Sequence, residues 1–161
     1  MVERVPMSKS GHQKLKKELS HLERVERHEV SKAIGIAREH GDLKENAEYH
    51  AAKERQGLIE ARIMDLKDKL GRAEIIDCTQ VDCSRAVFGT VVELLDMETD
   101  EEVSYQLLGS EESDVKKGSI SVFSPLGKSI LGKEVGDDVL AKTPGGSREF
   151  ELISISPSSF N

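Results

Sequence analysis

Residues 38–49 read R-E-H-G-D-L-K-E-N-A-E-Y, and they interrupt a helical pattern that covers residues 14–73. Within this stretch, Gly41 suits the left-handed residue that follows a helix C-terminus. Asp42 suits the N-cap of a second helix. The stretch therefore predicts a tight reversal between two helices.

Apolar residues recur on one helical face in both flanking segments. The first segment has Leu15, Leu19, Leu22, Val30, Ala33 and Ala37, with Val25 and Ile34 beside the stripe, and the second has Ala52, Ile59, Ile63, Leu66, Leu70 and Ala73. The second stripe has coiled-coil spacing, whereas the first is less regular because Glu26 falls where an apolar residue is expected. We expect an antiparallel hairpin whose arms of about 30 residues span roughly 45 Å.

The second half of the chain has a different pattern. Short β-like runs are predicted at 86–95, 101–108, 119–124, 139–142 and 148–155, with one or two helical turns at 125–131. Thr143-Pro144-Gly145-Gly146 is a strong turn signal. The predicted fold is α+β: a coiled-coil hairpin domain at 1–77 with its tip at 41–46, a linker at 78–85, a globular domain with an antiparallel sheet at 86–156, and a loose tail at 157–161.

Charge is divided unevenly between the halves. Residues 1–77 carry 16 Lys and Arg against 15 Asp and Glu, a formal charge of +1, whereas residues 78–161 carry 7 against 15, a charge of −8. Phosphates repel an acidic domain, so any contact with nucleic acid is expected in the first half. Aromatic residues are 4% of the chain, which argues against a stacking platform for single strands.

The chain has no visible signal peptide and no apolar run long enough to span a bilayer, so a cytoplasmic protein without a membrane partner is expected. Cys78 and Cys83 are interpreted as reduced thiols, with a disulfide or half of a zinc site as the alternatives.

Asp42 and Glu45 are the candidate functional residues. Asp-x-x-Glu at a helix start is also a capping-box pattern, so spacing alone favours a structural role. Their place at the exposed end of a long projection favours function instead. Two carboxylates can share one Mg²⁺ but cannot fill its six positions, so they suit half of a site that a partner completes.

Residues 41–54, G-D-L-K-E-N-A-E-Y-H-A-A-K-E, resemble the hairpin tip of the Gre family of bacterial transcript cleavage factors. The resemblance continues through I-L-G-K-E-V-G-D-D-V at 130–139 and K-T-P-G-G at 142–146, and so covers nearly the whole chain. It implies an immunophilin-like second domain. One departure is Gly127-Lys128, where the family commonly has Ala-Arg.

The resemblance also implies a mechanism. The hairpin would enter the secondary channel of a stalled RNA polymerase elongation complex, where Asp42 and Glu45 would complete a Mg²⁺ site shared with the polymerase. This two-metal site would promote hydrolysis of the backtracked nascent RNA near its 3′ end. The chain would be an accessory factor rather than an enzyme, with no small-molecule substrate.

Further residues are expected to contact these partners. Lys14, Lys17, His21, Arg24 and His28 step by 3 and 4, which predicts one basic helical face, either a solvated face or a groove for the RNA backbone. Arg38 and Lys53 match basic positions of the family near the tip. Ser124-Pro125-Leu126 resembles the loop by which the family's globular domain binds the polymerase. His12, His40 and His50 are interpreted as surface residues.

Two other functions remain open. One is a polymerase-channel binder that inhibits without cleavage, against which the intact tip carboxylates argue. The other is a prolyl-isomerase-like folding helper, which would need an aromatic-lined pocket. The second half offers Phe88, Tyr105, Phe123, Phe150 and Phe160 for such a pocket.

Overall fold

The computed structural model describes residues 3–41 and 45–159. Contacts divide the chain into two units. The first contains the described residues up to Val5 together with His12–Ala73, and the second contains Pro6–Gly11 and the chain from Glu74 onward. No helix among the described residues is both long and apolar enough to cross a bilayer.

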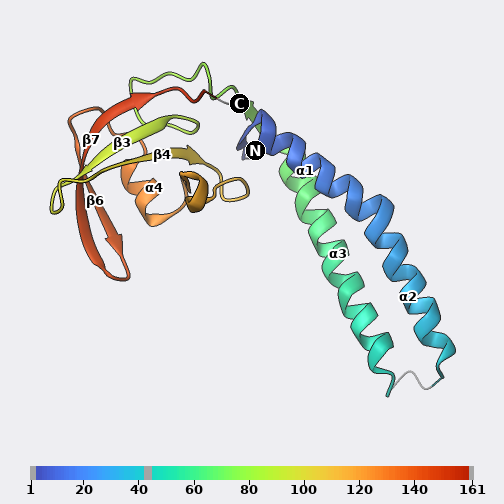
Figure 1. Cartoon of the computed structure of the whole chain (residues 1–161). Helices are drawn as coiled ribbons and strands as arrows, with labels where there is room; N and C mark the ends of the chain where they lie inside the picture. The colour runs from blue at the N-terminus through green and yellow to red at the C-terminus, as the bar shows by residue number, and fades with distance from the viewer. Residues whose placement is uncertain (1–2, 42–44, 160–161) are drawn as a thin grey trace. The chain divides into compact units, whose positions relative to one another are not determined.

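The predicted antiparallel helical hairpin is confirmed. Its first arm consists of α1 (Lys9–His21), a π-helical turn η1 (Leu22–Glu26) and α2 (Arg27–Glu39), and its second arm is α3 (Ala47–Gly71). Figure 1 shows α3 alongside the first arm. The buried residues of the seam are Leu15, Leu22, Val30, Ile34 and Ala37 on the first arm and Ile59, Ile63 and Leu66 on the second.

The π-helical turn explains the irregular stripe of the first arm. A π-turn adds one residue to a helix, which rotates all later side chains by about 100°. The seam therefore steps by eight residues from Leu22 to Val30, and Ile34 is buried in it rather than beside it. Val25 is 39% exposed, because it lies in the turn and not on the seam.

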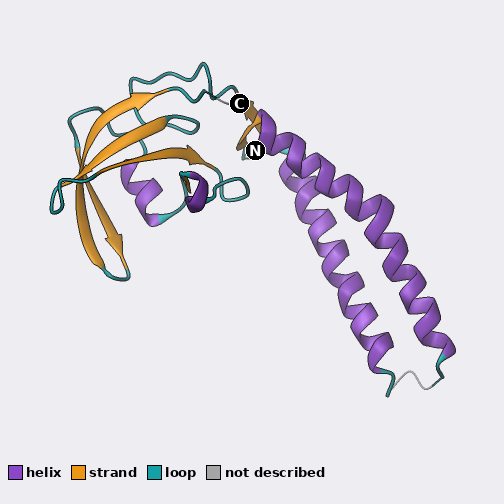
Figure 2. Ribbon diagram, in the orientation of Figure 1, coloured by secondary structure: helices purple, strands orange, loops and turns teal. Residues whose placement is uncertain are grey.

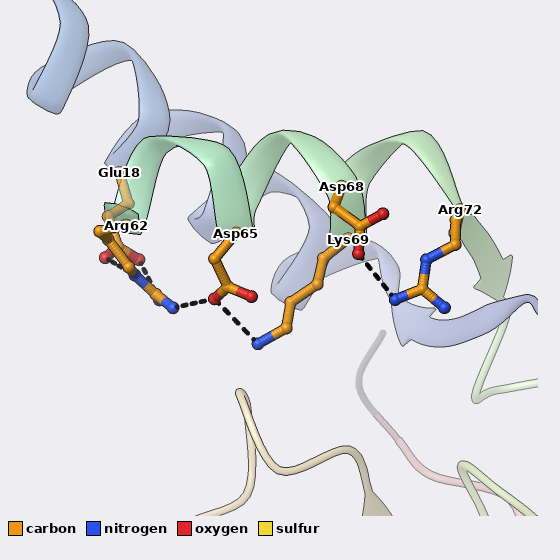
Figure 3. Close-up of polar contacts among 6 residues, drawn as sticks. All are labelled: Glu18, Arg62, Asp65, Asp68, Lys69 and Arg72. Atoms are coloured by element: carbon orange, nitrogen blue, oxygen red, sulfur yellow. Dashed lines mark hydrogen bonds and ion pairs between the residues drawn. The ribbon is translucent and has the colours of Figure 1, made fainter. Parts of the chain in front are cut away.

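Ion pairs between the arms flank the seam. Both carboxylate oxygens of Glu60 accept hydrogen bonds from Arg27, at 2.8 and 2.9 Å. These bonds hold the pKa of Glu60 below its ordinary value. Arg62 binds Glu18 in the same two-pronged manner and also donates to Asp65 within α3, as Figure 3 shows.

The second unit contains a five-stranded sheet with the order β5-β4-β3-β7-β6. Its strands are β3 (Val91–Asp96), β4 (Glu102–Leu108), β5 (Ser119–Ser121), β6 (Asp138–Thr143) and β7 (Gly146–Ser156) (Figure 2). The predicted turn at 143–146 joins β6 to β7. A further small sheet pairs β1 (Val5–Ser8) with β2 (Ala73–Ile76), neither of which was predicted.

The sheet is mixed rather than wholly antiparallel as predicted. β5 pairs with β4 in parallel, with Leu107 opposite Ile120. The 3₁₀ turn η2 (Val115–Lys117) lies in the connection between the two strands. This connection is long enough to return the chain to the start of β4, whereas a tight hairpin would have made the pair antiparallel.

The short helix α4 (Pro125–Ile130) packs against the sheet beside β6 and β5. Ile130 is fully buried there among Val92, Leu94, Leu107 and other core residues. Figure 2 shows this helix beside the strands. The predicted arrangement of five strands and one short helix is therefore observed.

Residues 78–85 are not simply the linker that their polar composition predicted. The side chain of Cys78 is fully buried in the core of the second unit, and its carbonyl accepts the N–H of Ser158 at 2.8 Å. Ser158, placed in the predicted loose tail, is only 7% exposed. The prediction was wrong at Cys78 because a free Cys packs as a small apolar residue. It was wrong at Ser158 because the backbone hydrogen bond holds this residue beside the buried Cys78.

Both cysteines are free thiols in this structure. Burial is the main cause that raises the pKa of Cys78 to about 11, and the negative charges of Glu112 and Asp77 add to it. The Cys78 thiol is therefore protonated and unreactive at neutral pH.

The segment Pro6–Gly11, which includes the start of α1, belongs to the second unit. Ser8 is buried, and its hydroxyl and its N–H both donate to the carboxylate of Glu112. The Ser8 hydroxyl oxygen also accepts the N–H of Gly11 at 3.0 Å, as a helix cap does. A Cβ atom on Gly11 would collide with the Glu112 carboxylate, so a larger residue there would displace that carboxylate from Ser8.

Candidate functional site at the hairpin tip

The second arm of the hairpin begins at Asn46 and not at Asp42. Asn46 is the N-cap of α3, and its side-chain oxygen accepts the N–H of Tyr49 at 3.0 Å. The prediction that Asp42 caps this helix was therefore wrong. Asp42 itself lies outside the described residues.

Glu45 lies immediately before this cap and is exposed. Because Asn46 is the N-cap, Glu45 does not occupy the third helical position that the second member of a capping box takes in α3. It forms no hydrogen bond or ion pair with another described residue. Together with His40, Asn46, Ala47 and Glu48 it lines a shallow hollow between the helix ends. Nothing in the described part of the hairpin requires a carboxylate at this position.

Three contacts join the end of α2 to the start of α3. The side-chain amide of Asn46 donates to the carbonyl of Ala37 at 2.5 Å. His40 and Glu48 approach to 3.6 Å between Nε2 and Oε2. The guanidinium of Arg38 lies 5.9 Å from the ring centre of Tyr49. The residues that flank the tip are thus held from both arms.

The described residues contain no group of three or more His, Cys, Asp or Glu side chains that could hold a metal ion. At the tip they supply Glu45 as an exposed carboxylate beside the end of α3. Carboxylate oxygens are the ligands that Mg²⁺ prefers, but one or two of them leave most of its six positions open. Glu45 could therefore supply only a small part of the coordination of such an ion.

The predicted basic residues of the first arm are all exposed. Lys14, Lys17 and Arg24 form no ion pair with a described carboxylate. The neighbouring acids Glu18 and Glu23 are instead turned to the second arm, where they bind Arg62 and Lys67. The acids therefore do not neutralise the basic face directly.

The π-helical turn divides this basic face. It rotates His28 by about 100° relative to Lys14, Lys17 and His21, so His28 leaves the predicted line. Arg24 lines a shallow groove of the hairpin, while Lys17 does not. The other residues of this groove are His12, Lys16, Leu19, Ser20, Glu23 and Leu70.

Arg38 and Lys53 both lie near the tip and are exposed, as the resemblance implied. Lys53 donates to the side-chain oxygen of Gln56 at 3.2 Å and has no described carboxylate partner. Both cations remain accessible to a phosphate.

The Ser124-Pro125-Leu126 loop is a helix start, as predicted. The Ser124 hydroxyl oxygen accepts the N–H of Gly127 at 3.1 Å, and Pro125 occupies the first turn of α4. Pro125 is exposed, whereas Leu126 is partly buried against the core. Phe123, just before the loop, is 59% exposed, and the sequence interpretation did not assign it to this surface.

Glycine at position 127 has a structural cause. A Cβ atom there would collide with the backbone carbonyl of Ser121, which is also the acceptor for the Ser124 hydroxyl at 2.6 Å. The departure from the family's common Ala is therefore tied to a close approach between α4 and β5.

Asn46 is the tip residue that the sequence interpretation missed. Asn is among the preferred N-cap residues, and it directly precedes the uninterrupted helical run of Ala47-Glu48-Tyr49. That signal was available but was assigned to Asp42. Its second bond, to Ala37, had no signal in the sequence because it depends on the approach of the two arms.

Fold and site together define a protein with an antiparallel helical hairpin, an acidic residue exposed beside the hairpin's tip and a small mixed-sheet domain. Two family models match: the N-terminal domain of the GreA/GreB transcription elongation factors over residues 5–75, and their C-terminal domain over residues 81–157. The chain belongs to the GreA/GreB family of transcription elongation factors.

Individual proteins are also similar to this chain. Transcription elongation factor GreA of Desulfotalea psychrophila is 71% identical over 160 residues, covering 99% of each chain. GreA of Pseudomonas aeruginosa is 50% identical over 151 residues, covering 93% of this chain and 96% of the relative. The crystal structure of GreA factor homolog 1 (Gfh1) of Thermus thermophilus has 34% identity, covers 95% of this chain and 99% of its own, and has a TM-score of 0.45.

Proposed function

We propose that this chain is a cytoplasmic accessory factor that binds RNA polymerase and stimulates cleavage of nascent RNA in backtracked complexes. The hairpin tip enters the secondary channel, and Asp42 and Glu45 act there. The observation that carries the proposal is the position of Glu45, which is exposed, precedes the helix cap and has no partner among the described residues.

Asp42 and Glu45 would hold a Mg²⁺ ion that they share with the polymerase. Bound there, the ion would activate a water molecule for attack on the phosphodiester. The contribution of this chain is to bring its carboxylates into the partner's site and to hold them there. The exposed position of Glu45 outside the helix supports this role.

The nascent RNA would lie along the basic residues of the hairpin. Lys17, Arg24, Arg38 and Lys53 are exposed and have no described carboxylate partner, which supports phosphate contact rather than an intramolecular role. Lysine and arginine contacts to phosphate position a nucleic acid without reading its sequence. The extruded 3′ segment is the part of the RNA that would reach them.

The globular domain would dock to the polymerase through Ser124, Pro125 and Leu126. Exposed apolar side chains beside this loop, above all Phe123, suit a protein partner better than a nucleic acid, and the formal charge of −8 in residues 78–161 would repel phosphates. No small-molecule substrate and no membrane are part of the proposal.

The two alternatives are less well supported. A non-cleaving channel binder has no need of an exposed carboxylate at position 45. A prolyl isomerase would need aromatic side chains around a pocket, but Phe88 and Phe150 are buried in the core, at 9% and 5% exposure. Fold likeness to immunophilins does not transfer their activity.

The decisive experiment uses a stalled elongation complex with labelled nascent RNA. The complex is incubated with and without this chain in the presence of Mg²⁺, and the RNA is sized. We expect shortened RNA that can be extended again when nucleotides are added. Binding to the complex without shortening would favour the inhibitor, and absence of binding would reject both functions.

A further inference from the structure

The side chain of Asn46 makes two hydrogen bonds to different helices. Its oxygen accepts the Tyr49 N–H at 3.0 Å in the first turn of α3, and its amide nitrogen donates to the Ala37 carbonyl at 2.5 Å in the last turn of α2. The donor and the acceptor identify the two amide atoms without ambiguity, because Tyr49 offers a proton and Ala37 a lone pair.

Only the first of these bonds is needed for a helix cap. Ser, Thr, Asp and Asn all accept such a bond and cap with similar strength. The second bond needs a donor on the same side chain, which Asp lacks and which Ser is too short to supply at this position. Asn46 therefore does more than cap α3, because its side chain also binds the end of α2.

The second bond ties together two ends that the hairpin must bring close. The Ala37 carbonyl is one of the last of α2 and also accepts the His40 N–H at 3.2 Å. Asn46 is half-buried, while the parallel link between His40 and Glu48 is 60% and 76% exposed. Exposed ion pairs contribute little, so Asn46 is the stronger connection.

We propose that Asn46 is a positioning residue that joins α2 to α3 and thereby fixes the direction in which Glu45 is presented. Glu45 is its immediate neighbour in the chain, so the anchored Asn46 limits where the Glu45 carboxylate can lie. The proposal rests on the proposed cleavage function. A catalytic group must be placed within about 0.5 Å, and a displacement of about 1 Å can cost about 10²-fold in rate.

The test separates the bond to Ala37 from the cap. Asn46→Asp and Asn46→Ser keep a cap acceptor and remove the bond to Ala37, because Asp has no donor and the Ser hydroxyl does not reach; the first adds a negative charge and the second does not. Asn46→Ala with Gly57→Ala removes both bonds but restores helix stability, because Gly57 is an exposed glycine within α3, and no atom lies within 4 Å of the position that an added methyl group would take. Gly57→Ala alone is the control.

Each full-length variant is added to the stalled complex over a range of concentrations. We expect both cap-retaining variants to remain folded at the assay temperature and to keep the half-saturating concentration of wild type, while the cleavage rate at saturation falls about 10-fold or more. We expect the double variant to remain slow although its stability is restored. Wild-type rates in Asn46→Ser, or recovery in the double variant, would overturn the proposal.

A second readout needs neither polymerase nor metal. We expect the backbone amide of Glu45 to show a lower NMR order parameter in Asn46→Ser than in wild type, with the amides of the α3 interior unchanged. An unchanged Glu45 amide would overturn the positioning role. If wild type fails to stimulate cleavage, the proposed function is wrong, and this NMR comparison still decides the role of Asn46.

Discussion

Glu45 and Glu54 are both exposed carboxylates of the second arm, and neither forms an ion pair with a described residue. They differ in position, because Glu45 precedes the cap at the end of the hairpin whereas Glu54 lies within α3. A comparison of variants at the two positions therefore tests whether cleavage needs a carboxylate at the tip or only one on the hairpin.

Glu45→Gln is expected to reduce stimulated RNA cleavage by about 10²-fold or more, as the loss of a preorganised charge does at other catalytic sites. Asp42→Asn is expected to act similarly. Polymerase binding, measured by co-migration with the elongation complex, should persist in both. Glu54→Gln is the matched control and should cleave at the wild-type rate; an equal loss there would remove the special role of the tip.

Asp96 is a buried carboxylate at the last position of β3, just before the turn, with 3% exposure. The N–H of Glu98 donates to it at 2.9 Å, and the guanidinium of Arg148 also donates. The Glu98 hydrogen bond is the main cause that holds the pKa of Asp96 below its ordinary value, and Arg148 adds to it. A lowered pKa in the folded state stabilises the fold above the ordinary pKa and ceases to do so as pH falls through the folded value.

Asp96→Asn should therefore lower the melting temperature at pH 7, and the difference from wild type should narrow as pH falls below about 4. Thermal melts across this range would measure it. Asp100→Asn in the same turn is the control, since Asn tolerates the positive φ of 60° found there. If the melting temperature of Asp96→Asn is lower than that of wild type by the same amount at every pH, the charge of Asp96 is not the cause of the stabilisation.

At the scale of the element, the π-helical turn η1 keeps both halves of the first arm on one seam. Leu22 and Val30 are eight residues apart and both buried in the seam. The extra residue of the π-turn lies between them and brings both side chains to the same face of the arm. Without that residue the step would be seven, which an ordinary helix accommodates as a heptad.

Deletion of Val25, which is largely exposed, should therefore convert η1 into regular α-helix and leave the hairpin folded, with stability within about 1 kcal/mol of wild type. Deletion of the exposed Ser31 in α2 is the control. That change should turn Ile34 and Ala37 relative to Val30 and unfold part of the arm. Circular dichroism melts would compare the stability of the two deletion variants. Equal stability would mean that η1 does not determine which side chains of α2 face the seam.

The basic face of the first arm is expected to act as a unit with the extruded RNA. Lys17→Ala with Arg24→Ala should reduce cleavage of deeply backtracked complexes more than of shallow ones, because a longer RNA reaches further along the arm. The defect should shrink at high salt, since wild type loses the same phosphate contacts.

The control for this prediction removes the same charge elsewhere. Arg55 and Lys67 on the second arm form ion pairs with first-arm carboxylates. Replacing both with Ala should therefore change the cleavage rate equally on deeply and shallowly backtracked complexes. If the Lys17 and Arg24 variant loses equal activity on deep and shallow complexes, these residues are part of an ordinary solvated surface and do not contact the RNA.

At the scale of the whole molecule, the short segment Pro6–Gly11 is structurally part of the second unit. Ser8 and Glu112 are 104 residues apart in sequence, and two hydrogen bonds join them. A fragment that begins at residue 78 would leave Glu112 without these donors. The second unit is therefore not defined by the C-terminal half of the sequence alone.

A double-mutant cycle of Ser8→Ala and Glu112→Ala should show a coupling free energy of about 1–3 kcal/mol in denaturant unfolding of the full chain, as hydrogen bonds to a charged group contribute. The cycle of Ser8→Ala with Glu102→Ala, an exposed residue of β4, should be additive. Additivity in the first cycle would mean that the segment is held by other contacts.

Features whose signals are local were predictable from the amino acids. The spacing of Ile59, Ile63 and Leu66 predicted the second arm, and Pro144-Gly145 predicted the turn between β6 and β7, because each depends on residues close in the chain. The tip was located correctly between the end of α2 and the start of α3. The role of Glu45 there stays a prediction. Asp42 was wrongly taken as the cap because Asp and Asn are equally good acceptors.

The remaining features were decided by contacts between distant segments. Asn46 binds the Ala37 carbonyl on the other arm. The long connection between β4 and β5 makes these strands parallel. Cys78 packs in the core beside residues of the sheet. Spacing along the chain reports which face a side chain occupies, but it carries no information about which distant backbone atom will meet that face. Hydrogen bonds and burial across such contacts exist only once the chain has folded.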